Sequence, residues 1–136
     1  MNALQNPLAL IGRILLAILF VPAGFGKIAG FEGMVGYANS VGMPMATVGV
    51  AAALVIELFG GLALLIGYRT RIAALLLALF TLVASFFFHN YWAMPADAQM
   101  MQSLMFFKNI AIVGGLLAFA AFGAGAWSLD AKRGQA

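Results

Sequence analysis

The residues that could take part in acid–base or ligand-binding chemistry are few, and most of them lie in or at the ends of long apolar stretches. Glu57 sits near the middle of one stretch, and Arg13 and Lys108 lie about one turn inside the ends of two others. An ionised side chain at the centre of a bilayer costs roughly 2.5–3.5 kcal/mol, so it usually has a partner. We therefore expect Glu57 to pair with Arg13, Lys108, or both. His89 and Asn109 would extend this network.

Two interpretations of the network stay open. In the first, the ion pair is structural and fixes the register of the helices. In the second, the network lines a small cavity that binds a ligand or carries protons. In that case His89, Lys108 and Asn109 could donate hydrogen bonds to a carbonyl of a quinone, and Glu57 could exchange protons.

Residues with other kinds of chemistry are scarce. The chain has no cysteine and one histidine, which excludes a disulfide framework, a thiol relay and a thiolate metal site. The sequence therefore predicts no metal site and no intrinsic cofactor, and no residue is assigned a catalytic role.

The composition identifies the solvent in which these residues must be placed. Of 136 residues, 65% are hydrophobic and 8% are charged, whereas a soluble domain is roughly a quarter charged. A chain this small could not bury so much apolar surface in water, so we expect it to lie in a lipid bilayer. The net charge of +3 is scattered rather than gathered in a basic stripe, so nucleic-acid binding is not expected.

Four apolar segments are long enough to cross the bilayer, for which about 20 residues are needed. They cover about residues 8–26, 46–67, 70–89 and 104–123. The predicted fold class is therefore all-α: one transmembrane domain over residues 1–136, built as a four-helix bundle. The second and third spans should form an antiparallel hairpin. Residues 28–44 are predicted to hold a short interfacial helix, with an ordinary loop as the alternative.

The basic residues indicate an orientation. Four of them fall on one side of the membrane in this topology: Arg69, Arg71, Lys132 and Arg133. Because cytoplasmic loops are enriched in Lys and Arg, we expect both termini in the cytoplasm. An alternative is that Arg13 and the apolar residues after it form a cleaved signal peptide, which the charge pattern opposes. Lys27, Tyr91 and Trp92 are expected at the membrane interface.

Stripes of small residues predict how the helices pack, because helices in lipid associate where their backbones can approach closely. Three spans carry such a stripe, and each stripe includes a polar group of its span. The stripes are Gly49, Ala53, Glu57 and Gly61; Ala74, Ala78, Thr81, Ser85 and His89; and Lys108, Ala111, Gly115 and Ala118. We expect all three to face the bundle interior.

Several short motifs occur in a specific order along nearly the whole chain. They are Gly12-Arg13, Gly26-Lys27, Val41-Gly42-Met43-Pro44, Glu57-Leu58-Phe59-Gly60-Gly61, Gly67-Tyr68-Arg69-Thr70-Arg71, His89, Lys108-Asn109 and Trp127-Ser128-Leu129-Asp130. In this order and spacing the sequence resembles the DoxX family of small bacterial membrane proteins. The resemblance implies a four-helix bundle in the bacterial inner membrane.

The resemblance also implies a class of function. Some members of the family are associated with quinone-linked and other membrane oxidoreductase systems, so the chain is expected to be an accessory or quinone-binding subunit with redox partner proteins. Because its own residues hold no redox centre, the electron chemistry would belong to the quinone or to a partner. The alternatives are a membrane scaffold or assembly factor, and a small-solute carrier. With only four spans, a carrier would need a homo-oligomer.

Overall fold

The computed structural model describes residues 2–135, and all regular secondary structure in this part of the chain is helical. The elements are α1 (Asn2–Ala29), α2 (Phe31–Ser40), α3 (Ala46–Ile66), α4 (Thr70–Phe88), the short 3-10 helix η1 (Tyr91–Ala93), α5 (Ala96–Phe122) and α6 (Leu129–Lys132). Four helical segments are long and apolar enough to span a membrane: Ala3–Ala29, Ala46–Ile66, Thr70–Ala93 and Ala96–Phe122. The all-α prediction with four spans is confirmed.

The observed helices extend beyond two of the predicted spans. α1 continues to Ala29, so Lys27 belongs to its last turn. α5 begins at Ala96, directly after Pro95, and its first turns carry polar side chains such as Asp97 and Gln102. An apolar run shows only the part of a helix that lies in the hydrocarbon. The helix itself continues into polar surroundings until its backbone is capped. Within residues 28–44, α2 is a helix and not a loop.

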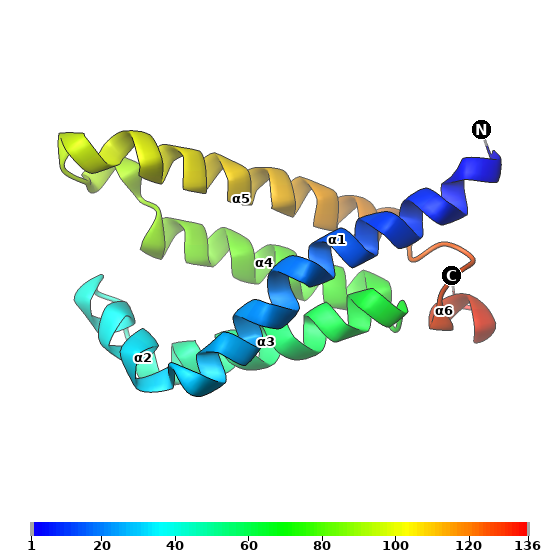
Figure 1. The fold of residues 1–136 in the computed structure, drawn as a ribbon, viewed down its shortest axis with the longest axis horizontal. Helices are drawn as coiled ribbons and strands as arrows, with labels where there is room; N and C mark the ends of the chain where they lie inside the picture. Colours follow the sequence, from blue (N-terminus) through cyan, green and yellow to red (C-terminus); the bar gives the residue numbers. More distant parts are fainter. Residues whose placement is uncertain (1, 136) are drawn as a thin grey trace.

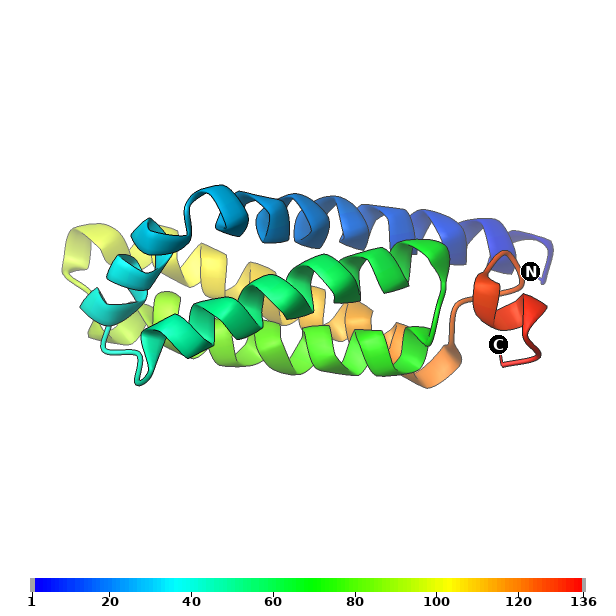
Figure 2. The same ribbon diagram turned by 90° about the horizontal axis from the view of Figure 1, so that it is seen from below.

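The long helices are arranged as two packed pairs. α1 packs on α3 and α4 packs on α5, and the turn between α3 and α4 joins the pairs as the predicted hairpin (Figure 1). The two termini lie at one end of the bundle, called here the termini end, and α2 lies at the opposite end, the α2 end (Figures 1 and 2). That the termini face the cytoplasm stays a prediction.

The contact between α1 and α3 depends on a glycine. A Cβ atom on Gly24 would lie 2.8 Å from the backbone nitrogen of Leu58, closer than real Cβ atoms approach, so the two backbones touch at this point. This is the small-residue packing expected of helices in lipid. The predicted stripes of α3 and α4 face inward as expected, since Ala53, Glu57, Ala74 and Thr81 are buried.

The stripe of α5 was predicted wrongly. Lys108, Ala111, Gly115 and Ala118 are all exposed, and a Cβ built on Gly115 would have no neighbour within 4 Å. α5 packs instead through Leu116 and the side chains around it. In a membrane helix both the lipid face and the packed face are apolar, so small residues alone do not identify the packed face.

The outer surface is apolar around the bundle. Large side chains such as Leu15, Phe59, Leu79 and Phe122 are more than 60% exposed. A soluble monomer rarely exposes so continuous an apolar surface, and in a bilayer these side chains contact acyl chains.

A polar cluster closes the termini end and ties three distant segments together. The Arg13 guanidinium is fully buried and donates to the carbonyl oxygens of Leu64 (3.2 Å), Leu65 (3.0 Å) and Trp127 (2.5 Å). Two of these carbonyls belong to the last turn of α3, where the helix dipole favours a cation; that of Leu64 also accepts from the Gly67 amide at 3.1 Å. Arg13 therefore joins α1 to the end of α3 and to the C-terminal segment.

Asp130 completes this cluster from the C-terminal segment. Its two carboxylate oxygens accept hydrogen bonds from the amides of Arg69 (2.7 Å) and Thr70 (2.8 Å) at the start of α4. Its own amide donates to the carbonyl of Gly67 at 2.8 Å. The first amides of a helix lack partners within it, so Asp130 caps α4 from a distance of sixty residues in sequence.

The stability of the protein is expected to fall in acid through Asp130. Burial tends to raise the pKa of this carboxyl, but the hydrogen bonds from Thr70 and Arg69 outweigh burial and lower the pKa below its ordinary value. A lowered native pKa means that the unfolded chain binds the proton more tightly. The Asp130 carboxylate therefore makes its full contribution to the free energy of unfolding above about pH 4, the ordinary pKa of Asp. This contribution is lost as the pH falls through the lowered pKa of the folded protein. Asp130→Asn is expected to cost about 1–2 kcal/mol at neutral pH.

Unfolding of the detergent-solubilised protein between pH 7 and pH 3 would test this expectation. The gap in stability between wild type and Asp130→Asn is expected to narrow as the pH falls. A gap that stays constant over this range would contradict the assignment of Asp130 as a charged cap.

Gly67, in the turn between α3 and α4, lies where there is no room for a side chain. Its φ is +69°, and an added Cβ would lie 2.4 Å from Cβ of Ser128 and 2.6 Å from the Arg13 guanidinium. Gly67→Ala is expected to destabilise the protein by about 2 kcal/mol or more, through both backbone strain and displacement of the polar cluster. Gly114→Ala is the matched control, because its Cβ would meet open space. This control is expected to be neutral or slightly stabilising in thermal unfolding.

Candidate functional site

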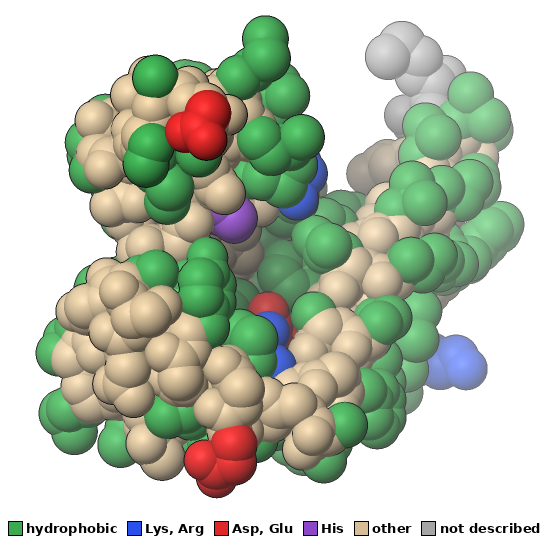
Figure 3. Space-filling view, turned by 60° about the vertical axis from the view of Figure 1, so that its left-hand side comes forward, with side chains coloured by type: hydrophobic (Ala, Val, Ile, Leu, Met, Phe, Trp, Pro, Cys, Tyr) green, Lys and Arg blue, Asp and Glu red, His purple; other side chains and the backbone are tan. Residues whose placement is uncertain are grey.

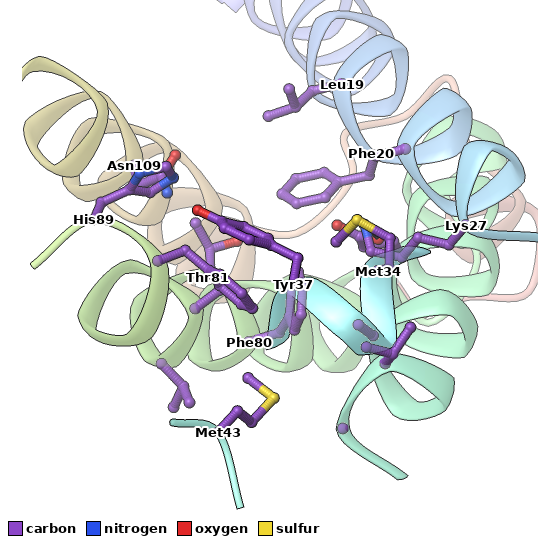
Figure 4. Close-up of a pocket in the computed structure, with 18 residues that line it drawn as sticks. Leu19, Phe20, Lys27, Met34, Tyr37, Met43, Phe80, Thr81, His89 and Asn109 are labelled. Carbon is purple, nitrogen blue, oxygen red and sulfur yellow. Dashed lines mark ion pairs between the residues drawn. The ribbon is translucent and has the colours of Figure 1, made fainter. Parts of the chain in front are cut away.

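A cavity of about 410 Å³ lies between the two helix pairs, on the side of the α2 end. Its lining residues come from α1 to α5 and are mostly apolar. They are Leu19, Phe20, Ala23, Lys27, Met34, Tyr37, Met43, Gly49, Val50, Ala53, Glu57, Phe80, Thr81, Val83, Ala84, Phe88, His89 and Asn109 (Figure 4). The volume lies in the range of small-molecule sites, which are typically apolar with a few placed polar groups.

The cavity is open on one side. Figure 3 shows a hollow between two lobes of the molecule, with acidic and basic side chains on its floor and a histidine on its wall. Near the termini end α1 and α5 come close, since a Cβ on Gly12 would lie 2.9 Å from the Phe119 ring. Toward the α2 end these two helices diverge (Figure 1). Leu19, which lines the cavity, is 41% exposed on this open side.

An ion pair between Lys27 and Glu57 forms one part of the lining. Lys27 Nζ lies 2.5 Å from Glu57 Oε2, and the two side chains are 15% and 8% exposed. The expected pair of Glu57 with Arg13 or Lys108 is therefore wrong. Lys27, expected to reach out to the membrane interface, turns into the cavity instead.

The helix register explains why Lys27 is the partner. Gly24 of α1 contacts Leu58 of α3, so the last turns of α1 lie level with the middle of α3. Lys27 is within one turn of Glu57 along this antiparallel pair. Arg13 is about 12 residues from that level, or roughly 18 Å, which its side chain cannot bridge.

The other two predicted cations lie outside the cavity lining. Arg13 is held at the termini end, as described above. Lys108 is exposed, and its amine has a contact of 3.5 Å with Met105 Sδ. Both corrections share one reason: depth estimated from span boundaries does not show which way a side chain points.

The wall opposite the ion pair carries neutral polar groups. Asn109 Nδ2 donates to Ser85 Oγ at 3.1 Å, and Ser85 Oγ donates to the carbonyl of Thr81 at 2.6 Å. His89 Nδ1 lies 2.8 Å from Gln102 Oε1. The Thr81 hydroxyl is different, because it is only 5% exposed as a residue and has no hydrogen-bond partner in the described chain. The Thr81 oxygen is covered by neighbouring atoms, so the accessible polar groups of this wall are those of His89 and Asn109.

α2 supplies the lining at the α2 end through Met34 and Tyr37. The Tyr37 ring stacks on Phe88 of α4, with centroids 5.4 Å apart. In Figure 4 the hydroxyl end of Tyr37 points toward His89 and Asn109. α2 thus bridges the two helix pairs over the cavity. It also adds the Tyr37 hydroxyl to the hydrogen-bonding groups of His89 and Asn109.

Tyr91 and Trp92 belong to a separate aromatic cluster. They lie in η1 with their own centroids 5.2 Å apart, and they pack against Phe86, Phe106 and Phe107 at centroid distances of 5.5–6.0 Å. None of these five rings lines the cavity. Their placement at the membrane interface stays a prediction.

The predicted site residues thus fall into two groups. Glu57, His89 and Asn109 do line one cavity, whereas Arg13 and Lys108 do not. The sequence interpretation missed Lys27, Tyr37 and Thr81 as lining residues. Thr81 had been noted only as part of a packing stripe, and nothing in the sequence shows that its hydroxyl lacks a partner. Within residues 2–135 no group of three His, Asp or Glu side chains could hold a metal ion.

Comparison with known proteins supports the family resemblance. A family model described as DoxX matches residues 8–90. Inner membrane protein YqjF of Escherichia coli (strain K12) is 44% identical over 132 residues, which is 96% of this chain and 95% of the relative. Inner membrane protein YphA of the same organism is 38% identical over 131 residues, 96% and 94% of the two chains.

A more distant similarity reaches a eukaryotic protein. The ER-derived vesicles protein ERV29 of Saccharomyces cerevisiae is 32% identical over 79 residues, which is 58% of this chain and 26% of that protein. No solved structure matches the chain. The bacterial relatives and the four membrane-spanning helices together place the chain in the inner membrane as a multi-pass protein.

Proposed function

Because the chain belongs to the DoxX family of membrane proteins, we propose that it binds a small lipid-soluble ring compound, such as a quinone, as an accessory subunit of a membrane oxidoreductase system. The observation that carries the proposal is the cavity between the helix pairs. Its apolar walls suit a ring, and its lining includes six polar residues that lie in helices α1 to α5 or directly follow α4: Lys27, Tyr37, Glu57, Thr81, His89 and Asn109.

The site fits a quinone-like head group in both shape and chemistry. Phe20, Phe80 and Phe88 line the cavity and can contact the faces of a ring. Tyr37, His89 and Asn109 line the same cavity and supply hydrogen-bonding groups for ring oxygens. Lys27 and Glu57 can meet polar atoms at the other side of the ring. When bound, a quinone would supply the electron-carrying chemistry; this chain would orient it and exclude water.

The open side of the cavity supports access from the bilayer. Exposed apolar residues such as Leu19 border the hollow where α1 and α5 diverge. A molecule dissolved among acyl chains would therefore reach the cavity without crossing an aqueous layer. This route favours a lipid-soluble ligand over a water-soluble solute.

The proposal can be tested on protein purified in mild detergent. Solvent extraction followed by mass spectrometry is expected to release a lipid-soluble ring compound in near-stoichiometric amount. In titrations with a short-chain benzoquinol, the reduced form of the ring, binding is expected to raise the thermal midpoint of wild type. His89→Ala is expected to weaken binding about tenfold, the effect of one hydrogen bond in a buried site.

Lys108→Ala is the matched control, because it removes a polar side chain that lies near His89 in depth but outside the cavity lining. This variant is expected to bind as wild type does. No extracted ring compound, together with no thermal shift at saturating quinol or quinone, would remove the proposed function.

A further inference from the structure

We propose that the cavity recognises its ligand through a hydroxyl group that donates a hydrogen bond to His89, so that a phenolic, reduced ring binds more tightly than its ether or its carbonyl form. Gln102, which lies outside the cavity lining, is the residue that sets this preference. The inference rests on the proposed function and names the chemical class of ligand that the same site selects.

His89 and Gln102 are in contact between the end of α4 and the first part of α5. Nδ1 of His89 lies 2.8 Å from Oε1 of Gln102. An amide oxygen only accepts hydrogen bonds, so in the neutral ring Nδ1 carries the proton and donates to Gln102. The other ring nitrogen, Nε2, then has a lone pair and no proton, and it can only accept. The wall therefore offers an acceptor to the ligand at His89.

The backbone around His89 keeps the ring in this position. His89 directly follows α4, and its amide donates to the carbonyl of Ser85 at 3.0 Å. Gln102 lies in the polar first part of α5, across from the end of α4. The His89–Gln102 hydrogen bond thus joins the two helices of one pair, which limits rotation of the imidazole.

A ligand hydroxyl supplies the donor that this acceptor lacks. It can donate its proton to Nε2 of His89, which lines the cavity. A carbonyl or ether oxygen at the same place would face the lone pair of Nε2 without a proton between them. A buried acceptor left without a donor weakens binding.

The test compares ligands that differ only in this proton. Titrations of the protein in nanodiscs would use 1-naphthol, 1-methoxynaphthalene and 1,4-naphthoquinone, which share one ring system. Wild type is expected to bind 1-naphthol about tenfold more tightly than either of the others, the effect of one net hydrogen bond. Equal affinities for the three rings would overturn the inference.

Variants of Gln102 separate positioning from simple loss of structure. Gln102→Glu keeps an acceptor beside Nδ1 and is expected to retain the preference for the hydroxyl. Gln102→Lys places a donor there, which favours the proton on Nε2, and is expected to abolish or reverse the preference while ring binding persists. A purely structural role for Gln102 would change all three affinities together.

Nitrogen NMR gives a readout that does not depend on binding. The chain has one histidine, so a sample labelled with ¹⁵N-histidine reports His89 alone. Wild type is expected to show the tautomer protonated at Nδ1, and the tautomer protonated at Nε2 would overturn the inference. Absence of binding by every ring would overturn the proposed function as well, whereas binding without selectivity would overturn this inference alone.

Discussion

Replacing Arg13 with methionine is expected to destabilise the protein by about 3 kcal/mol, because the carbonyls of Leu65 and Trp127 lose their donor and that of Leu64 keeps only the Gly67 amide. The guanidinium is fully buried and holds the end of α3 and the C-terminal segment against α1. Arg13→Lys keeps the charge but cannot contact all three carbonyls with one ammonium group, so it is expected to recover less than half of the loss. Chemical unfolding in detergent micelles measures both values.

Lys108→Met is the matched control for Arg13→Met. It removes the same charge from a comparable side chain, but Lys108 is exposed and makes no hydrogen bond to an oxygen within residues 2–135. The control is expected to change stability by no more than about 0.5 kcal/mol. Equal stability of the two variants would contradict the role assigned to Arg13.

The second large effect concerns the ion pair in the cavity. Lys27→Leu leaves Glu57 alone near the middle of α3, and an unpaired charge at this depth costs roughly 2.5–3.5 kcal/mol. Glu57→Leu is expected to cost less, because Lys27 lies in the last turn of α1 and its long side chain can reach toward the membrane surface. The double variant Lys27→Leu/Glu57→Leu is expected to be more stable than Lys27→Leu, since it contains no lone charge.

A double-mutant cycle on these variants measures the coupling between Lys27 and Glu57. We expect a coupling of about 1–3 kcal/mol. The charge exchange Lys27→Glu/Glu57→Lys is expected to recover the stability that each single substitution loses. The exchange Arg13→Glu/Glu57→Arg is not expected to do so. Additive effects of Lys27→Leu and Glu57→Leu would show that the two side chains do not interact.

The parts of the fold that follow from solvation could be predicted from the sequence. The composition requires hydrocarbon as a solvent, and the apolar runs with their glycine breaks give four spans and the α3–α4 hairpin. The ends of the helices could not be predicted in the same way. α5 starts at Ala96 rather than near residue 104, because its polar first turns form a helix without being apolar.

The candidate site was predicted in part, and the errors have a geometric cause. Glu57, His89 and Asn109 were identified because a polar residue in an apolar span needs a partner. The partner itself depends on the register of α1 against α3, which is set by the contact of Gly24 with Leu58. The position of the Thr81 hydroxyl and the contact between His89 and Gln102 depend on side-chain geometry that no spacing in the sequence shows.

The most direct test of this account is native mass spectrometry of the protein released from nanodiscs. Wild type is expected to carry one adduct with the mass of a lipid-soluble ring compound. Ala53→Trp fills the cavity from α3 and is expected to lose the adduct, whereas Ala51→Trp, on the exposed face of the same helix, is expected to keep it. A wild-type protein without an adduct, or one adduct retained equally by both variants, would contradict a ligand site between the two helix pairs.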